Sequence, residues 1–131
     1  MRLEGRRLTM RNVATIEGEV VKSDDPVSFL GDVDPDTGTI TNRKNNLYGV
    51  TIKNKVFAFP IGRGSTVGSY VMYRLFKNGC IPKAILNQRS ETIVAVGAVI
   101  SNIPLMDQVD LERLRTGQRV RIEGNVLEVQ E

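Results

Sequence analysis

Residues 55–79 constrain the fold most, because a strand pattern changes to a helix pattern there across a glycine-rich turn. Residues 55–60 (KVFAFP) are mostly apolar, which is typical of a buried strand. Residues 66–78 carry apolar side chains at helical spacing. Ser65 stands where an N-cap is expected and Gly79 where a C′ glycine is expected. The order strand, glycine turn, helix predicts a mixed α/β domain.

The rest of the chain predicts further short strands. Residues 15–22 alternate between apolar and polar, and residues 119–123 and 126–129 alternate around Gly124-Asn125, a usable hairpin turn. The β-branched run at residues 92–101 (TIVAVGAVIS) predicts one or two central strands. Weaker expectations are strands at residues 39–41, 47–52 and 83–86, and a short amphipathic helix over residues 107–115 ended by Gly117. Together they predict one strand-rich domain over residues 1–131 with two to three helices.

Basic charge is concentrated at the N-terminus. Residues 1–13 contain four arginines and one glutamate, whereas the other 14 basic and 14 acidic residues balance. This distribution predicts a basic N-terminal tail over residues 1–13, either solvated or docked on a partner. A nucleic-acid-binding arm is not favoured, because no aromatic side chains for base stacking accompany the arginines.

Several classes of protein are excluded by what the sequence lacks. No apolar run approaches the roughly 18 residues of a membrane span, and no secretory signal pattern follows Met1. Without histidine, the chain cannot hold a His-based triad, a His–Zn site or a phosphohistidine. Cys80 is the single cysteine, which fits a reducing cytoplasm and predicts a small side chain that is buried or half-buried. One thiol cannot hold an iron–sulfur cluster, so no metal site is expected on this chain.

The glycine-rich turn Gly62-Arg63-Gly64-Ser65-Thr66 is the candidate functional motif. It fails as a dinucleotide fingerprint, because the third glycine comes at position 68 and not at 67, and no Lys-Ser/Thr pair completes a P-loop. What remains is a turn whose free N–H groups and helix dipole favour an anion, with Arg63 as a bidentate partner. The structural alternative is that Ser65 is only a helix N-cap.

Two other polar stretches have weaker interpretations. Residues 32–36 (DVDPD) begin like a calcium loop, but Thr37 and Arg43 stand where that loop needs Gly and Glu. An acidic turn closed by its own Asx bonds is therefore favoured. Residues 87–91 (NQRSE) form a polar connection that is either surface or pocket rim.

Two segments together resemble one known family. Residues 26–38 (PVSFLGDVDPDTG) and residues 59–69 (FPIGRGSTVGS) resemble, in order and in strand context, two motifs of the aconitase X small-subunit family. The resemblance runs from about Gly18 to Ser101, and residues 114–124 are similar to the ending of other swivelling domains. Leu30 replaces the usual Trp and Asp32 replaces the second Gly, but the serine motif is intact.

The resemblance implies a swivelling β/β/α domain, as in the last domain of aconitase. It implies a hydro-lyase formed as a heterodimer, in which a large aconitase-like subunit carries an iron–sulfur cluster. The small subunit would supply Ser65 as the base that takes the proton α to the carboxylate of a hydroxy acid. Candidate substrate-binding residues in the two segments are Ser28, Arg63, Gly64 and Thr66.

The family contains two substrate groups. One group dehydrates (R)-mevalonate 5-phosphate to trans-anhydromevalonate 5-phosphate for isoprenoid synthesis, and the separate short chain favours this group. The other group dehydrates cis-3-hydroxy-L-proline, often with the two parts fused. A non-catalytic binding domain is the alternative from a different functional class.

Overall fold

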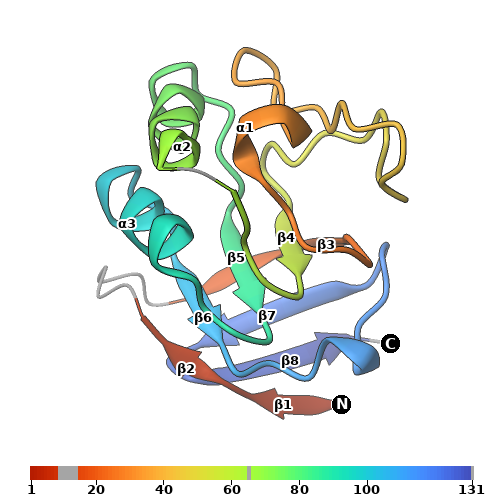
Figure 1. Ribbon diagram of the computed structural model, residues 1–131. Helices are drawn as coiled ribbons and strands as arrows, with labels where there is room; N and C mark the ends of the chain where they lie inside the picture. The colour runs from red at the N-terminus through yellow and green to blue at the C-terminus, as the bar shows by residue number, and fades with distance from the viewer. Residues whose placement is uncertain (9–14, 65, 131) are drawn as a thin grey trace.

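The computed structural model describes residues 1–8, 15–64 and 66–130. Within these ranges one eight-stranded sheet has the order β1-β8-β7-β3-β4-β5-β6-β2 (Figure 1). Its strands are β1 Arg2–Glu4, β2 Arg6–Arg7, β3 Ile16–Lys22, β4 Val56–Phe59, β5 Ala84–Asn87, β6 Leu105–Asp107, β7 Arg119–Glu123 and β8 Val126–Gln130. The helices are α1 Phe29–Asp32, α2 Val67–Lys77, α3 Thr92–Ile100 and the short 3-10 helix η1 Leu111–Arg113.

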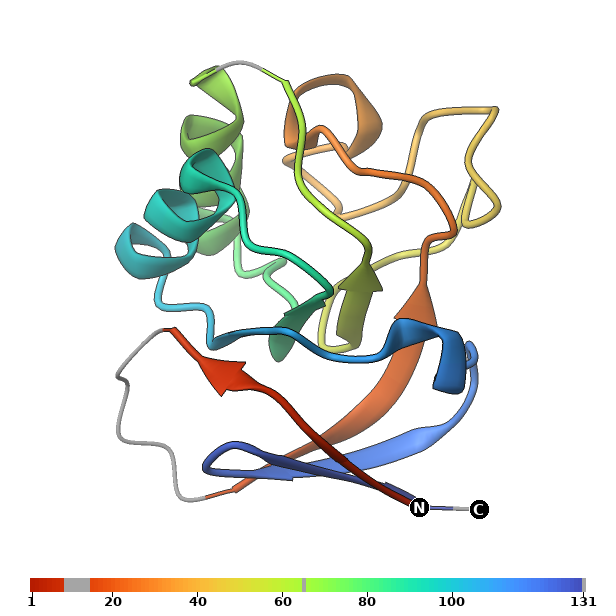
Figure 2. The same cartoon turned by 60° about the horizontal axis from the view of Figure 1, so that its bottom comes forward.

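The sheet is curled so that its two ends meet. Strands β3, β4, β5 and β6 are parallel, whereas β7, β8, β1 and β2 each pair antiparallel with their neighbours. Strands β1 and β2 stand at opposite ends of the sheet order, yet only Gly5 separates them in the chain (Figure 2). A β-carbon on Gly5 would lie 2.8 Å from the carbonyl oxygen of Asp107, so the residue at this junction must be small.

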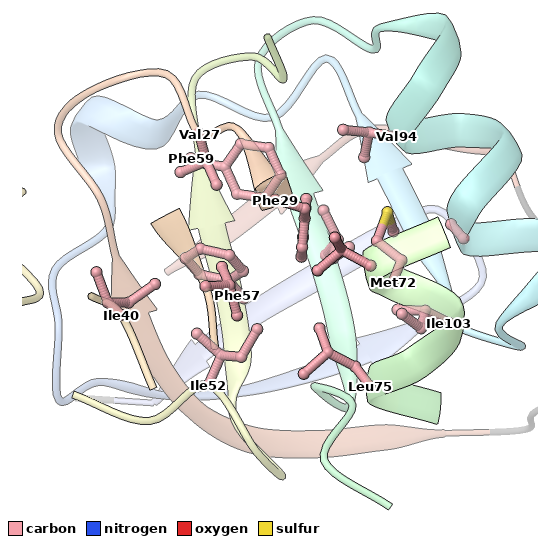
Figure 3. Packing of buried hydrophobic residues seen from close by; sticks show 14 of the residues in the cluster. Val27, Phe29, Ile40, Ile52, Phe57, Phe59, Met72, Leu75, Val94 and Ile103 are labelled. Atoms are coloured by element: carbon pink, nitrogen blue, oxygen red, sulfur yellow. The ribbon is translucent and has the colours of Figure 1, made fainter. Parts of the chain in front are cut away.

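Strand β4 separates two hydrophobic cores. Val56 and Ala58 point into the curled sheet, where they join residues such as Leu86 and Leu127. Phe57 and Phe59 point to the helix-covered face and pack against Phe29, with ring centroids 6.2 and 6.0 Å away (Figure 3). Since side chains alternate between the faces of a strand, a strand buried on both faces is apolar throughout, as the sequence predicted for residues 55–60.

Helix α2 confirms the predicted helix of residues 66–78. It ends in a Schellman motif, because the N–H of Cys80 donates to Leu75 O (2.8 Å) and that of Gly79 to Phe76 O (3.1 Å). Gly79 has a φ of +70°, which confirms it as the C′ glycine. The N-cap prediction for Ser65 lies outside the described residues, and Thr66 occupies the position before the helix.

The prediction of one or two central strands at residues 92–101 is wrong, because this segment forms helix α3. The carboxylate of Glu91 caps the helix by accepting hydrogen bonds from Ile93 N (2.9 Å) and Val94 N (3.1 Å). Gly97 lets α2 approach closely, since a β-carbon there would collide with Met72 Sδ. Packing against α2 and a side-chain cap thus outweigh the strand preference of the β-branched residues.

Three further predictions need correction. Residues 47–52 form turns with an isolated bridge between Thr51 and Thr39, not a strand. The helix expected at residues 107–115 is reduced to η1, and Asp107 belongs to β6. The prediction of a basic N-terminal tail is wrong for the described residues of that segment, because residues 2–4 and 6–7 are strands of the sheet.

Most of the other strand predictions are confirmed. The strands of residues 15–22 and 83–86 correspond to β3 and β5, and the hairpin around Gly124-Asn125 corresponds to β7 and β8. The strand predicted at residues 39–41 is wrong, because these residues contribute isolated bridges only. None of the helices in the described ranges has the length and apolar character needed to cross a membrane.

Candidate functional site

The two sequence segments that carry the family resemblance lie side by side beyond the carboxyl end of β4. Val27 forms a parallel bridge with Gly62. Val27 N donates to Ile61 O (3.2 Å) and Arg63 N donates to Val27 O (2.9 Å). Helix α1 and the start of α2 are consequently neighbours (Figures 1 and 2). Binding sites of parallel sheets are commonly found at this edge.

Ser28 lies close against Gly64 of the other segment. Gly64 has a φ of +104°, and a β-carbon on it would collide with Ser28 Oγ. The Ser28 hydroxyl donates to Leu30 O at 2.8 Å, which fixes its direction. Two of the predicted substrate-binding residues are therefore brought together, although their binding role stays a prediction.

Asp32 holds the turn that carries Ser28. Its carboxylate is buried and accepts hydrogen bonds from Ser28 N (2.8 Å) and Asn42 Nδ2 (3.0 Å). Arg63 Nη2 lies 4.0 Å from the same carboxylate, at the limit of an ion pair. This role was not predicted from the sequence, where Asp32 is only a departure from the family motif. No local pattern identifies Asn42 or Arg63 as its neighbours.

Arg63 stands two residues before Ser65 in the chain and Thr66 directly follows it, and both Arg63 and Thr66 are exposed. Thr66 precedes the first turn of α2, and its carbonyl accepts a hydrogen bond from Ser69 Oγ at 2.8 Å. Arg63, Gly64 and Thr66 thus lie at the start of a helix, where partial positive charge favours an anion. Ser65 itself lies outside the described residues, so its role as a base stays a prediction.

A polar pocket opens beside Arg63. It has a volume of about 300 Å³ and is lined by Asp25, Pro26, Asn42, Lys44, Asn45 and Arg63. This pocket was not predicted from the sequence. Its residues come from three separate segments, and their meeting depends on the tertiary fold.

The connection at residues 87–91 supports the fold and part of it is buried. Asn87 is buried, and its Nδ2 donates to Phe59 O at 2.8 Å. Glu91 caps α3, and Val94 of that helix lies against the glycine turn. A β-carbon on Gly62 would collide with the Val94 side chain. Gly62 is therefore required for close packing of the turn on α3.

Metal binding finds no support in the described residues. They contain no group of three or more His, Cys, Asp or Glu side chains able to hold a metal ion. Cys80 is buried as predicted, with its Sγ 3.4 Å from the carbonyl oxygens of Asp36 and Asn78. The acidic turn at residues 32–36 is confirmed as an Asx turn, because Asp36 N donates to Asp34 Oδ1 at 2.9 Å. These side chains do not fit an iron–sulfur cluster.

Similarity to known sequences extends over almost the whole chain. Residues 3–130 match the sequence model of the aconitase X swivel domain. The chain is 49% identical over 133 residues to the phosphomevalonate dehydratase small subunit of Thermococcus onnurineus, covering 100% of both chains. It is 52% identical over 128 residues to the phosphomevalonate dehydratase small subunit of Methanosarcina acetivorans, covering 95% of this chain and 87% of that one.

Solved structures agree with these matches. The crystal structure of aconitase X from Thermococcus kodakaraensis, in its holo-form, superimposes with a TM-score of 0.94 at 47% identity, covering 100% of this chain and 99% of that one. A 3-isopropylmalate dehydratase from Methanocaldococcus jannaschii superimposes with a TM-score of 0.60 at 16% identity, covering 89% of this chain and 83% of that one, and shows the fold alone. The predicted swivelling α/β fold is thereby confirmed. The chain belongs to the aconitase X swivel-domain family.

Proposed function

We propose that this chain is the small subunit of a heteromeric hydro-lyase that converts mevalonate 5-phosphate into trans-anhydromevalonate 5-phosphate. The proposal rests on the similarity to relatives named phosphomevalonate dehydratase small subunit. About half of the residues are identical over nearly the whole chain. The juxtaposition of the two motif segments at Ser28 and Gly64 supports an intact site in this chain. The small subunit of a cis-3-hydroxy-L-proline dehydratase and a non-catalytic binding domain are the alternatives.

The dehydration needs a base and groups that stabilise negative charge. Loss of water from a β-hydroxy acid removes the proton on the α-carbon and releases the hydroxyl group. Ser65 is the proposed base, because it is the serine of the glycine-rich motif that precedes α2 in the chain. A serine hydroxyl is a weak acid, so its alkoxide needs stabilisation by neighbouring N–H groups and by the positive end of the helix dipole. Arg63 is proposed to bind an anionic group of the substrate.

The other half of the site is proposed to come from a large aconitase-like subunit. The described residues of this chain do not fit an iron–sulfur cluster, so we assign any such cluster to the partner. Helices α2 and α3 expose Tyr70, Val96, Val99 and Ile100, and Val99 is 62% exposed. Exposed apolar side chains on these two helices support burial against another protein.

Co-expression with the candidate large subunit tests the proposal. The purified complex should dehydrate mevalonate 5-phosphate, followed by NMR of substrate and product, and the isolated small chain should be inactive. A complex that dehydrates cis-3-hydroxy-L-proline and leaves mevalonate 5-phosphate unchanged would assign the chain to the other substrate group. A chain that forms no complex would instead support the non-catalytic alternative.

A further inference from the structure

Resting on the proposed function, we propose that the pocket beside Arg63 binds the phosphate group of the substrate, with Lys44 and Arg63 as its cationic ligands. The pocket has a volume of about 300 Å³. That is at the lower end of the roughly 300–1,000 Å³ found for small-molecule sites, which suits one end of a small substrate.

The charges of the lining favour an anion. Lys44 and Arg63 bring two positive charges, and Asp25 brings one negative charge. Among the described residues, no hydrogen bond or ion pair engages the Lys44 ammonium, and Arg63 only approaches Asp32 at 4.0 Å. Both cations are therefore available for a phosphate group, with which charged donors form strong hydrogen bonds.

The segment that presents Lys44 is held by side-chain hydrogen bonds. Lys44 N donates to Asn42 Oδ1 (3.0 Å), and Asn42 Nδ2 donates to the buried carboxylate of Asp32 (3.0 Å). Asn45 is buried and its Nδ2 donates to Ser23 Oγ at 2.8 Å. These bonds fix the backbone of Lys44 before a ligand arrives, which lowers the entropic cost of binding.

Arg63 connects the pocket to the proposed base. It lines the pocket and precedes Ser65 by only two residues. In mevalonate 5-phosphate the phosphate stands at one end of a short chain, and the reacting α-carbon lies next to the carboxylate at the other end. A cation that adjoins both the pocket and the glycine-rich motif suits this arrangement, because it can hold the phosphate end of the substrate close to that motif.

The test measures recognition of the phosphate in the complex of both subunits. Lys44→Gln removes one positive charge and keeps a polar side chain. It should lower kcat/KM for mevalonate 5-phosphate about tenfold or more, the loss expected for one charge-assisted hydrogen bond. The binding of unphosphorylated mevalonate, measured as alternative substrate or competitive inhibitor, should stay unchanged.

Two matched variants control for charge. Lys53→Gln makes the same change at an exposed lysine that precedes β4, whereas the pocket lies beyond the other end of that strand. This variant should alter neither kcat/KM for mevalonate 5-phosphate nor the binding of mevalonate. Asp25→Asn removes the negative charge from the lining, so kcat/KM for mevalonate 5-phosphate should rise. A fall in kcat/KM would indicate that the pocket binds a positively charged group of the substrate, and would overturn the proposal.

Other outcomes also overturn it. If the wild-type complex is active and Lys44→Gln leaves kcat/KM for mevalonate 5-phosphate unchanged, the pocket does not bind the phosphate, while the proposed function stands. An equal loss for mevalonate and its phosphate would make Lys44 a structural residue. A wild-type complex inactive on mevalonate 5-phosphate would overturn the proposed function and this inference with it.

Discussion

Ser28 and Gly64 lie so close together that a β-carbon on Gly64 would collide with the Ser28 hydroxyl. They belong to separate segments, which the backbone hydrogen bonds between Val27 and residues 61–63 hold together. Gly64 also has a φ of +104°, a conformation that favours glycine. The contact therefore couples the α1 turn to the turn that precedes α2.

Replacement of Gly64 by alanine should disturb this coupling and reduce activity. The new methyl group would push Ser28 and the α1 turn away from the glycine turn, at a cost of about 1–3 kcal/mol for overpacking. In the complex, Gly64→Ala should lower kcat at least tenfold and lower the melting temperature, both measured on the purified heteromer.

Gly117→Ala is the matched control. Gly117 has a φ of +97°, but no heavy atom beyond its two chain neighbours lies within 4 Å of the place that a β-carbon on it would take. It therefore carries the same backbone strain without the collision. This variant should lose some stability and keep its kcat. If both glycine variants retain wild-type kcat, the close approach of Ser28 to Gly64 is not needed for activity.

Glu91 should stabilise α3 through its side-chain cap. Glu91→Ala removes the acceptors of Ile93 N and Val94 N and should reduce the free energy of unfolding by about 1 kcal/mol. Urea denaturation followed by circular dichroism measures the change. Glu112→Ala, at an exposed position in η1, should leave the free energy within about 0.5 kcal/mol of wild type. Equal values for both variants would remove the cap from the explanation of α3.

Asp107 should make stability depend on pH below neutrality. Arg6 donates to its carboxylate from Nε (3.0 Å) and Nη2 (2.8 Å), and this hydrogen bonding lowers the pKa of Asp107, with a smaller contribution from Ser90. A lowered pKa in the folded state stabilises the fold above the unfolded pKa of about 3.9, and this stabilisation disappears as the pH falls through the folded pKa.

Asp107→Asn tests that dependence. The variant should be less stable than wild type at pH 7, and the difference should narrow as the pH falls below about 4. Urea denaturation at pH 7, 5 and 3 measures it. Asp110→Asn changes an exposed carboxylate nearby and should follow the wild-type pH dependence. A difference between wild type and Asp107→Asn that stays constant over this range would contradict the assignment.

Local patterns predicted the elements that depend on local contacts. The strand, glycine turn and helix of residues 55–79 follow from the apolar spacing and from Gly79, and the structure has both the strand and the helix. Helix α3 was not predictable in this way, because its close packing depends on Met72 from another helix meeting Gly97. Its β-branched sequence favours a strand until that contact is known.

Long-range pairs explain the remaining differences. Counting charges assigned Arg6 to a basic tail, but its partner Asp107 is 101 residues away and closes the sheet. At the site, Arg63 and Gly64 were predicted from a local motif. Asp32 and Lys44 were missed, because their neighbours come from distant segments that only the fold brings together.

The most direct test of the proposed function is the turnover of mevalonate 5-phosphate by the Ser65→Ala complex. The variant should still assemble with the large subunit and should lose kcat by about a thousandfold or more, as expected for loss of a general base. Ser69→Ala, in the first turn of α2, is the control and should retain most of the activity. Near-normal turnover by an intact Ser65→Ala complex would contradict the assignment of Ser65 as the base.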